Sequence, residues 1–181
     1  MKFQLILTTL LFISLVSCEK YEPTTVPTTA GTIRTYTSED WDYWEINDGT
    51  IRTYTSEDWD YWEYNLANSS GTIRTYTSED WDHWEVDGGD LDIRTYTSED
   101  WDYWEISGNE VDITIRTYTS ADWDHWEVTG DVKTTMRTYT SEDWDFWEVR
   151  DDLSIYSPQV QAAIQFIPIF TSSLYIRGIV D

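Results

Sequence analysis

A fourteen-residue unit that recurs six times limits what this chain can fold into more than any other feature. The first copy spans residues 33–46 and reads Ile-Arg-Thr-Tyr-Thr-Ser-Glu-Asp-Trp-Asp-Tyr-Trp-Glu-Ile. The other five copies begin at Ile51, Ile73, Ile93, Ile115 and Met136. Successive copies are therefore 18 to 22 residues apart. A repeat this strict implies that every copy forms the same structural unit and that neighbouring units share a core.

Each unit predicts a β-hairpin, because β-branched and aromatic residues flank a polar turn cluster at residues 38–41. Folding the first copy at Glu39-Asp40 makes its two arms complementary. The paired residues would be Ile33 with Ile46, Arg34 with Glu45, Thr35 with Trp44, Tyr36 with Tyr43, and Thr37 with Asp42. Cross-strand pairs of these kinds each contribute about 0.2–1 kcal/mol. The predicted fold class is all-β, with six tandem hairpins of about 20 residues each forming a solenoid, a meander or a closed barrel.

A strand followed by a short helix is the alternative reading of the same unit. Ser38 could cap a helix whose first turn holds Glu39 and Asp40. The units would then resemble those of leucine-rich solenoids. Trp, Asp and Tyr have low helix propensity, and a helix of one or two turns is marginal in isolation. We therefore favour the hairpin.

The first eighteen residues have the pattern of an export signal. Lys2 precedes an almost wholly apolar run at residues 3–16, which is too short to span a bilayer comfortably. It ends in Leu-Val-Ser-Cys at residues 15–18, which resembles the lipobox of bacterial lipoproteins. That resemblance implies that residues 1–17 are a signal peptide and that Cys18 carries acyl chains that anchor the protein to a membrane. Cys18 is the only cysteine, so the chain contains no intramolecular disulfide.

The rest of the chain divides into three parts. Residues 18–32 comprise the lipidated cysteine and a Pro/Thr tether, and residues 33–149 form the six-repeat β domain. Residues 150–181 break the repeat and are apolar from Gln159 to Phe170 around Pro168, which predicts a C-terminal cap over the last repeat. The expected location is the bacterial cell envelope, at the outer membrane, on its periplasmic or its surface face.

Charge excludes one class of partner. Without residues 1–17, ten basic residues stand against thirty-five acidic ones, a formal charge of −25. Nucleic acids need Lys and Arg to displace counterions from phosphate, so a nucleic-acid partner is not expected. The chain is also 17% aromatic, which argues against a disordered acidic polymer.

Tryptophan supplies the candidate ligand contacts. Two tryptophans per unit, in the frame Trp-Asp-x-Trp-Glu, would lie on opposite faces of a strand, so that one row packs in the core and the other meets solvent. Exposed indoles beside carboxylates can hold sugar rings or quaternary ammonium groups. The candidate ligand-binding residues are Trp41, Trp44, Trp59, Trp62, Trp81, Trp84, Trp101, Trp104, Trp123, Trp126, Trp144 and Trp147. The units resemble choline-binding cell-wall repeats in size and aromatic content only, and the alternative is that both rows are core.

Paired aspartates are the candidate metal ligands. The two aspartates of each unit would share a strand face, and Ca²⁺ suits clustered carboxylate oxygens. The candidates are Asp40, Asp42, Asp58, Asp60, Asp80, Asp82, Asp100, Asp102, Asp122, Asp124, Asp143 and Asp145. The chain has no Asp-x-Asp-x-Asp-Gly loop, so a solvated acidic edge that limits aggregation is favoured over a Ca²⁺ site. No other cofactor is expected.

Nothing in the repeats distinguishes a catalytic constellation. His83 and His125 occupy a position that Phe146 fills in the last copy, so this is a packing position. Six equal units offer no singular acid–base pair, and an enzyme is not expected. The predicted function is multivalent binding of a glycan or another cell-surface polymer. The alternatives are a structural spacer with buried tryptophans, a Ca²⁺-binding array, or an ice-binding array based on the repeated Thr-x-Thr.

Overall fold

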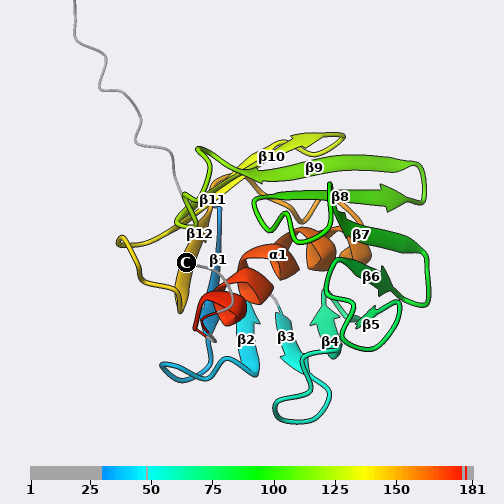
Figure 1. Ribbon diagram of the computed structural model, residues 1–181, viewed down its shortest axis with the longest axis horizontal. Coiled ribbons are helices and arrows are strands. Elements are labelled where there is room, and N and C mark those ends of the chain that lie inside the picture. The colour runs from blue at the N-terminus through cyan, green and yellow to red at the C-terminus, as the bar shows by residue number, and fades with distance from the viewer. Residues whose placement is uncertain (1–29, 48, 177, 179–181) are drawn as a thin grey trace, which may run out of the picture.

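The structure is a closed antiparallel barrel of twelve strands with a single helix (Figure 1). It is a computed structural model that describes residues 30–47, 49–176 and 178. The strands are β1 (Gly31–Thr35), β2 (Tyr43–Ile46), β3 (Gly49–Thr53), β4 (Tyr61–Leu66), β5 (Ser69–Thr75), β6 (His83–Val86), β7 (Leu91–Thr95), β8 (Tyr103–Gly108), β9 (Val111–Thr117), β10 (His125–Gly130), β11 (Thr134–Thr138) and β12 (Phe146–Val149). The helix is α1 (Pro158–Ile176).

Each sequence repeat forms one hairpin, so β1–β2 is hairpin 1 and β11–β12 is hairpin 6. The predicted register is confirmed, since Ile33 lies opposite Ile46, Arg34 opposite Glu45, and Thr35 opposite Trp44. The all-β prediction is confirmed, and the strand-plus-helix alternative is wrong because both arms of every repeat are strands. Of the three arrangements left open, the structure is the closed barrel.

Closure joins the first and last strands. β1 pairs antiparallel with β12, with Gly31 opposite Val149 and Ile33 opposite Trp147. The Ala30 N–H donates to the Val149 carbonyl oxygen at 3.0 Å. The barrel thus begins at Gly31, two residues earlier than the boundary expected from the repeat. A closed sheet has no free edge on which another chain could add a strand.

Alternation along each strand separates the lumen from the outer wall. In hairpin 1, Ile33 and Trp44 are buried and point inward, whereas Arg34 and Glu45 lie on the outside. The same pattern recurs in all six hairpins. The period of two in a strand therefore places the apolar part of each repeat in the lumen and the charged part in solvent.

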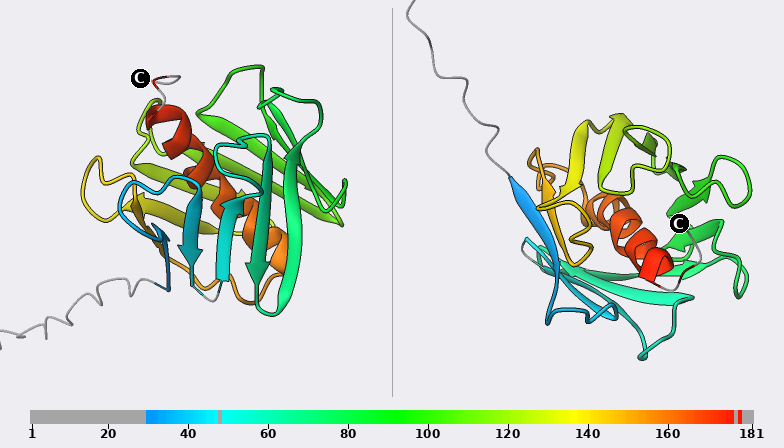
Figure 2. Two further views of the ribbon diagram at one scale, coloured as in Figure 1. Left: turned by 90° about the horizontal axis from the view of Figure 1, so that it is seen from below. Right: turned by 60° about the vertical axis from the view of Figure 1, so that its left-hand side comes forward.

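Helix α1 fills the lumen. Strands surround it in both views of Figure 2, and its residues 160–174 are buried. It contacts β4, β5, β7 and β8, so the prediction that this segment caps the last repeat is wrong. The physical reason is that a twelve-strand barrel encloses more space than its inward side chains alone can fill. A helix that is apolar all round is stable only when it is buried on every side.

Polar side chains in α1 mostly bond to its own backbone. The hydroxyls of Thr171, Ser172 and Ser173 donate to carbonyls of the preceding turn at 2.8, 2.6 and 2.9 Å. Gln165 Nε2 donates to the Gln161 carbonyl at 3.1 Å, but the buried Gln165 Oε1 has no partner. The helix can therefore carry these groups inside the barrel with one unsatisfied acceptor.

Candidate functional site

Six tryptophans line the lumen rather than the surface. These inner tryptophans are Trp44, Trp62, Trp84, Trp104, Trp126 and Trp147, and each is 0% exposed. Phe166 and Phe170 of α1 pack edge-on against Trp84, with ring centroids 4.9 and 4.7 Å away. The structure thus gives half of the candidate ligand-binding tryptophans a place in the core.

The other six lie in the hairpin loops and are half-buried. These loop tryptophans are Trp41, Trp59, Trp81, Trp101, Trp123 and Trp144. The prediction that the two tryptophans of a unit lie on opposite strand faces is wrong, because β2 begins only at Tyr43. Trp44 instead turns back on its own loop, where its Nε1 donates to the Trp41 carbonyl oxygen at 2.9 Å. The three-residue spacing of Trp-Asp-x-Trp therefore satisfies a buried indole N–H.

Tyrosine supplies the exposed aromatic surface. Six tyrosines, one at the end of the first strand of each hairpin, are 55–63% exposed. This tyrosine belt consists of Tyr36, Tyr54, Tyr76, Tyr96, Tyr118 and Tyr139. The repeat predicts the Tyr36–Tyr43 pair, but ligand binding was assigned to tryptophan because one row of tryptophans was expected on the solvent face of a strand. The available signal was the strand period, which places Tyr36 on the same outer face as Arg34.

Each belt tyrosine packs on a second aromatic ring from the other arm of its hairpin. Tyr54 and Tyr61 are stacked with centroids 4.8 Å apart, and Tyr36 and Tyr43 meet edge-on at 5.0 Å. In hairpins 3 and 5 the second ring is a histidine, and in hairpin 6 it is Phe146. The six pairs hold their exposed rings in place at one level around the barrel wall.

An arginine on the next hairpin borders each aromatic pair. Arg52 lies opposite Tyr43 on one side and opposite Glu63 on the other. Arg52 Nη2 and Glu63 Oε2 are 3.0 Å apart, and the equivalent Arg34–Glu45 pair is 2.6 Å apart. These pairs are exposed enough that each adds little to stability. The pairs place hydrogen-bond donors and acceptors beside the aromatic rings.

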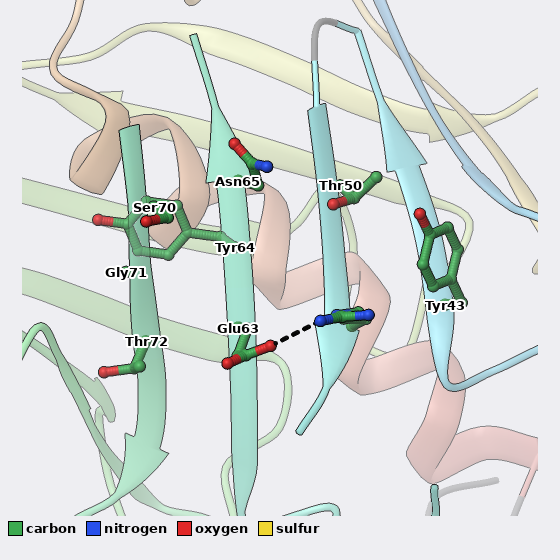
Figure 3. Close-up of a pocket in the computed structure, with 9 residues that line it drawn as sticks. Tyr43, Thr50, Glu63, Tyr64, Asn65, Ser70, Gly71 and Thr72 are labelled. Carbon is green, nitrogen blue, oxygen red and sulfur yellow. Dashed lines mark hydrogen bonds and ion pairs between the residues drawn. The ribbon is translucent and has the colours of Figure 1, made fainter. Parts of the chain in front are cut away.

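A hollow of about 550 Å³ lies on the outer wall over β2–β5. Figure 3 shows Tyr43 at one side of this hollow and Ser70, Gly71 and Thr72 at the other. Glu63 lies between them (Figure 3), and its partner Arg52 is on β3, the strand between β2 and β4. The lining therefore consists of two tyrosines, Tyr43 and Tyr64, with hydroxyl, amide and charged groups, and the hollow has the volume of a small-ligand site.

One lining residue is specific to this part of the barrel. Tyr64 replaces the aliphatic residue found at this position in the other repeats, and its hydroxyl donates to Asp87 Oδ2 at 2.5 Å. Burial, followed by the hydrogen bond to Asp87, raises the pKa of Tyr64 well above its usual value. The phenol therefore stays protonated and acts as a structural donor. Asp87 also accepts from the Thr72 backbone N–H at 2.8 Å, so it ties β5 to the turn after β6.

The second aspartate of each unit links neighbouring hairpins. Asp42 Oδ2 accepts from Ser56 Oγ at 2.6 Å and from the Glu57 N–H at 3.1 Å in the next hairpin. The same link, which we call the aspartate clasp, joins every hairpin to the next and closes from Asp145 back to Ser38 at 2.9 Å. The clasp residues are Asp42, Asp60, Asp82, Asp102, Asp124 and Asp145.

The aspartate clasp explains why alanine can replace glutamate in the loop of hairpin 5. Its backbone donor belongs to a residue with positive φ, which is 63° at Glu57 and 60° at Ala121. Ala121 donates its N–H to Asp102 Oδ2 at 3.0 Å just as glutamates do elsewhere. The glutamate side chain is thus not needed for the clasp.

At the seam between hairpins 6 and 1, two aspartates interact. Burial and a hydrogen bond to Asp145 raise the pKa of Asp143. Burial alone would also raise the pKa of Asp145, but hydrogen bonds from Asp143, Ser38 and the Glu39 N–H outweigh it and lower that pKa. The two carboxyl groups therefore titrate at different pH, with Asp145 ionising at a lower pH than Asp143.

Among the described residues, no group of three or more His, Cys, Asp or Glu side chains is placed to bind a metal ion. The first threonine of each Thr-x-Thr is buried in the lumen, so the pair forms no flat outer ladder. The signal peptide, Cys18 and most of the tether lie outside the described residues. In the part that is described, no helix is both long and apolar enough to cross a membrane.

Comparison of the chain with protein-family models, with curated proteins and with solved structures finds no match. Functional inference therefore rests on the geometry of the barrel wall.

Proposed function

We propose that this protein is a lipid-anchored display module that binds neutral glycan chains of the cell surface through its tyrosine belt. The observation that carries this proposal is the sixfold recurrence of an exposed tyrosine, 55–63% accessible, that rests on a second ring. Six rings exposed at equivalent positions form a repeated aromatic surface, and tyrosine, with an apolar ring and a polar hydroxyl, is enriched at interaction surfaces. An aromatic face beside fixed polar groups is suited to a sugar, which presents an apolar ring face and a rim of hydroxyls.

Charge defines the class of glycan. The full chain has a net charge of −24, so acidic polysaccharides are repelled at long range. A neutral sugar is not repelled, and the Arg52–Glu63 pair can offer it both a donor and an acceptor. Each belt tyrosine presents a single exposed ring, so one tyrosine alone is expected to bind weakly, with useful affinity arising from several of them together.

Titration calorimetry with neutral gluco-, manno- and xylo-oligosaccharides tests this proposal. Replacing all six belt tyrosines by alanine should weaken binding of the best oligosaccharide at least tenfold, which is about 1.4 kcal/mol. The matched control replaces the five loop glutamates, Glu39, Glu57, Glu79, Glu99 and Glu142, by alanine. Neutral-sugar binding should survive that change, because Ala121 already occupies this position in hairpin 5.

A structural spacer is the second candidate, and the burial of all six inner tryptophans favours it. If no oligosaccharide in the three classes binds the wild-type chain, the glycan proposal fails and the spacer remains. Oligosaccharide binding that disappears in the glutamate control but persists in the tyrosine variant would contradict the tyrosine belt as the binding surface.

The lipid anchor is proposed from residues 15–18 and has a separate test. Cys18→Ser should move the protein from the membrane fraction to the soluble fraction of the producing bacterium, because a single signal-derived acylation site provides the whole anchor. A Cys18→Ser protein that remains in the membrane fraction would refute this part of the proposal.

A further inference from the structure

The closed ring of sites determines how a polymer can engage them. Neighbouring belt tyrosines are two strands apart, and a strand spacing of about 4.8 Å places adjacent sites about 10 Å apart around the wall. Twelve strands at this spacing give a circumference of about 60 Å. Six sites on such a ring point in six different directions.

Tyr36 of hairpin 1 and Tyr96 of hairpin 4 are three hairpins apart in the closed order, so they lie on opposite sides of the barrel. The lumen between them holds α1 (Figure 1), and a helix with its side chains is about 10 Å wide. One chain could reach both tyrosines only by bending around half of the barrel. Adjacent sites, such as Tyr36 and Tyr54, are close enough for a single extended chain.

The sites also cannot turn to face a common direction. Each belt tyrosine packs on a second ring of its hairpin, and each loop is tied to the preceding hairpin by its aspartate clasp. The barrel is closed by hydrogen bonds between β1 and β12, so the ring cannot open into a straight row. The directions of the six sites are therefore fixed by the fold.

We infer that the protein cross-links separate glycan chains instead of tracking one chain, with opposed sites on the barrel holding different polymer strands. This inference rests on the proposed glycan binding and adds the partner arrangement. A lipid-anchored barrel of this kind would tie neighbouring surface polysaccharide strands to each other and to the membrane.

Two variants with equal numbers of substitutions test the inference. The opposed variant keeps Tyr36 and Tyr96, the adjacent variant keeps Tyr36 and Tyr54, and the other four belt tyrosines are alanine in each. A variant that keeps only Tyr36 is the monovalent control. All three change exposed side chains, for which large losses of stability are not expected.

The full chain in mild detergent is mixed with a soluble neutral β-glucan, and light scattering is followed as the ratio of protein to polymer increases. Wild type and the opposed variant should give a scattering maximum at least fivefold above the monovalent control. The adjacent variant should scatter little but bind the polymer at least fivefold more tightly than the monovalent control, since both of its sites engage one chain.

Titration with the glucan tetrasaccharide distinguishes a failure of the cross-linking inference from a failure of glycan binding itself. If the tetrasaccharide binds wild type but the adjacent variant scatters as strongly as the opposed one, cross-linking by opposed sites is refuted and glycan binding stands. The same holds if wild type binds the polymer without scattering. If the tetrasaccharide does not bind, glucan binding and the cross-linking inference both fail.

Discussion

At the scale of single residues, the aspartate clasp accounts for much of the strictness of the repeat. Asp82 accepts hydrogen bonds from Ser98 Oγ at 2.6 Å, from the Glu99 N–H at 2.7 Å and from Thr95 Oγ1 at 2.9 Å. The side chain of the other aspartate of that loop, Asp80, accepts a long bond from the Thr77 hydroxyl at 3.3 Å. Two aspartates two positions apart in every copy thus have unequal roles.

Asp82→Ala should lower the free energy of unfolding by about 1–3 kcal/mol, because it leaves three donors without their acceptor. Asp80→Ala is the matched control in the same loop and should cost less than about 1 kcal/mol. Urea unfolding of the two variants checks the difference. Equal losses, or a larger loss for Asp80→Ala, would contradict the clasp.

The roles of some residues in the repeat can be predicted from the sequence, and the roles of others cannot. The complementarity of Ile33 with Ile46 and of Arg34 with Glu45 is local, so pairing within a hairpin could be predicted. The clasp could not, because Asp42 bonds to Ser56 in another hairpin, and a strand model placed both aspartates of the unit on one face. Trp41 was placed on a strand, but it lies in the loop, because β2 begins only at Tyr43.

At the scale of elements, α1 is the part that the repeat could not predict. Its apolar composition shows that it must be buried, but the sequence carries no mark of whether it covers the last hairpin or enters the barrel. That choice depends on the width of the lumen, which follows from strand number and closure. A hairpin repeat alone is compatible with a solenoid, a meander or a barrel.

Substitution of Gln165 tests whether α1 is buried in the lumen. Its Oε1 has no partner although the residue is almost fully buried, so Gln165→Met should raise the free energy of unfolding by about 1 kcal/mol. Gln161→Met is the matched control one turn away, and it should lower stability because Gln161 Nε2 donates to the Tyr156 carbonyl at 2.8 Å. Thermal unfolding that shows both variants destabilised alike would argue against α1 lying in the lumen.

At the scale of the whole molecule, closure depends on the seam between hairpins 6 and 1. Unfolded aspartates titrate near pH 4. Asp145 has a lowered pKa, so its contribution is present above about pH 4 and is lost as the pH falls through its folded pKa. Asp143 has a raised pKa, so its contribution is present below about pH 4 and is lost as the pH rises through its folded pKa.

Substitution of each seam carboxyl by the neutral amide should therefore have opposite effects. Asp143→Asn keeps an uncharged donor at every pH, so its stability relative to wild type should increase from pH 4 to pH 7. Asp145→Asn loses the charged acceptor, so its stability relative to wild type should decrease as the pH rises towards about 4 and then stay level. Urea unfolding at several pH values measures both trends, and parallel profiles for the two variants would contradict the opposite pKa shifts of the two carboxyl groups.

The closed barrel also determines which repeated aromatic residues a ligand can reach. The tryptophans are perfectly repeated, two per unit, yet six of them form the inner wall of the barrel. The belt tyrosines are repeated just as strictly and stand outside. Each repeat thus contains both residues that pack in the core and residues that are exposed on the outer wall. Closure of the barrel determines which residues are which.

Hydroxyl-radical footprinting of the native full chain, read residue by residue by mass spectrometry, tests this division most directly. We expect rapid labelling of all six belt tyrosines. All six inner tryptophans should be strongly protected until the protein is unfolded, although a free indole is highly reactive toward radicals. Inner tryptophans that label as fast in the native protein as the belt tyrosines would contradict the filled, closed barrel and the assignment of binding to its outer wall.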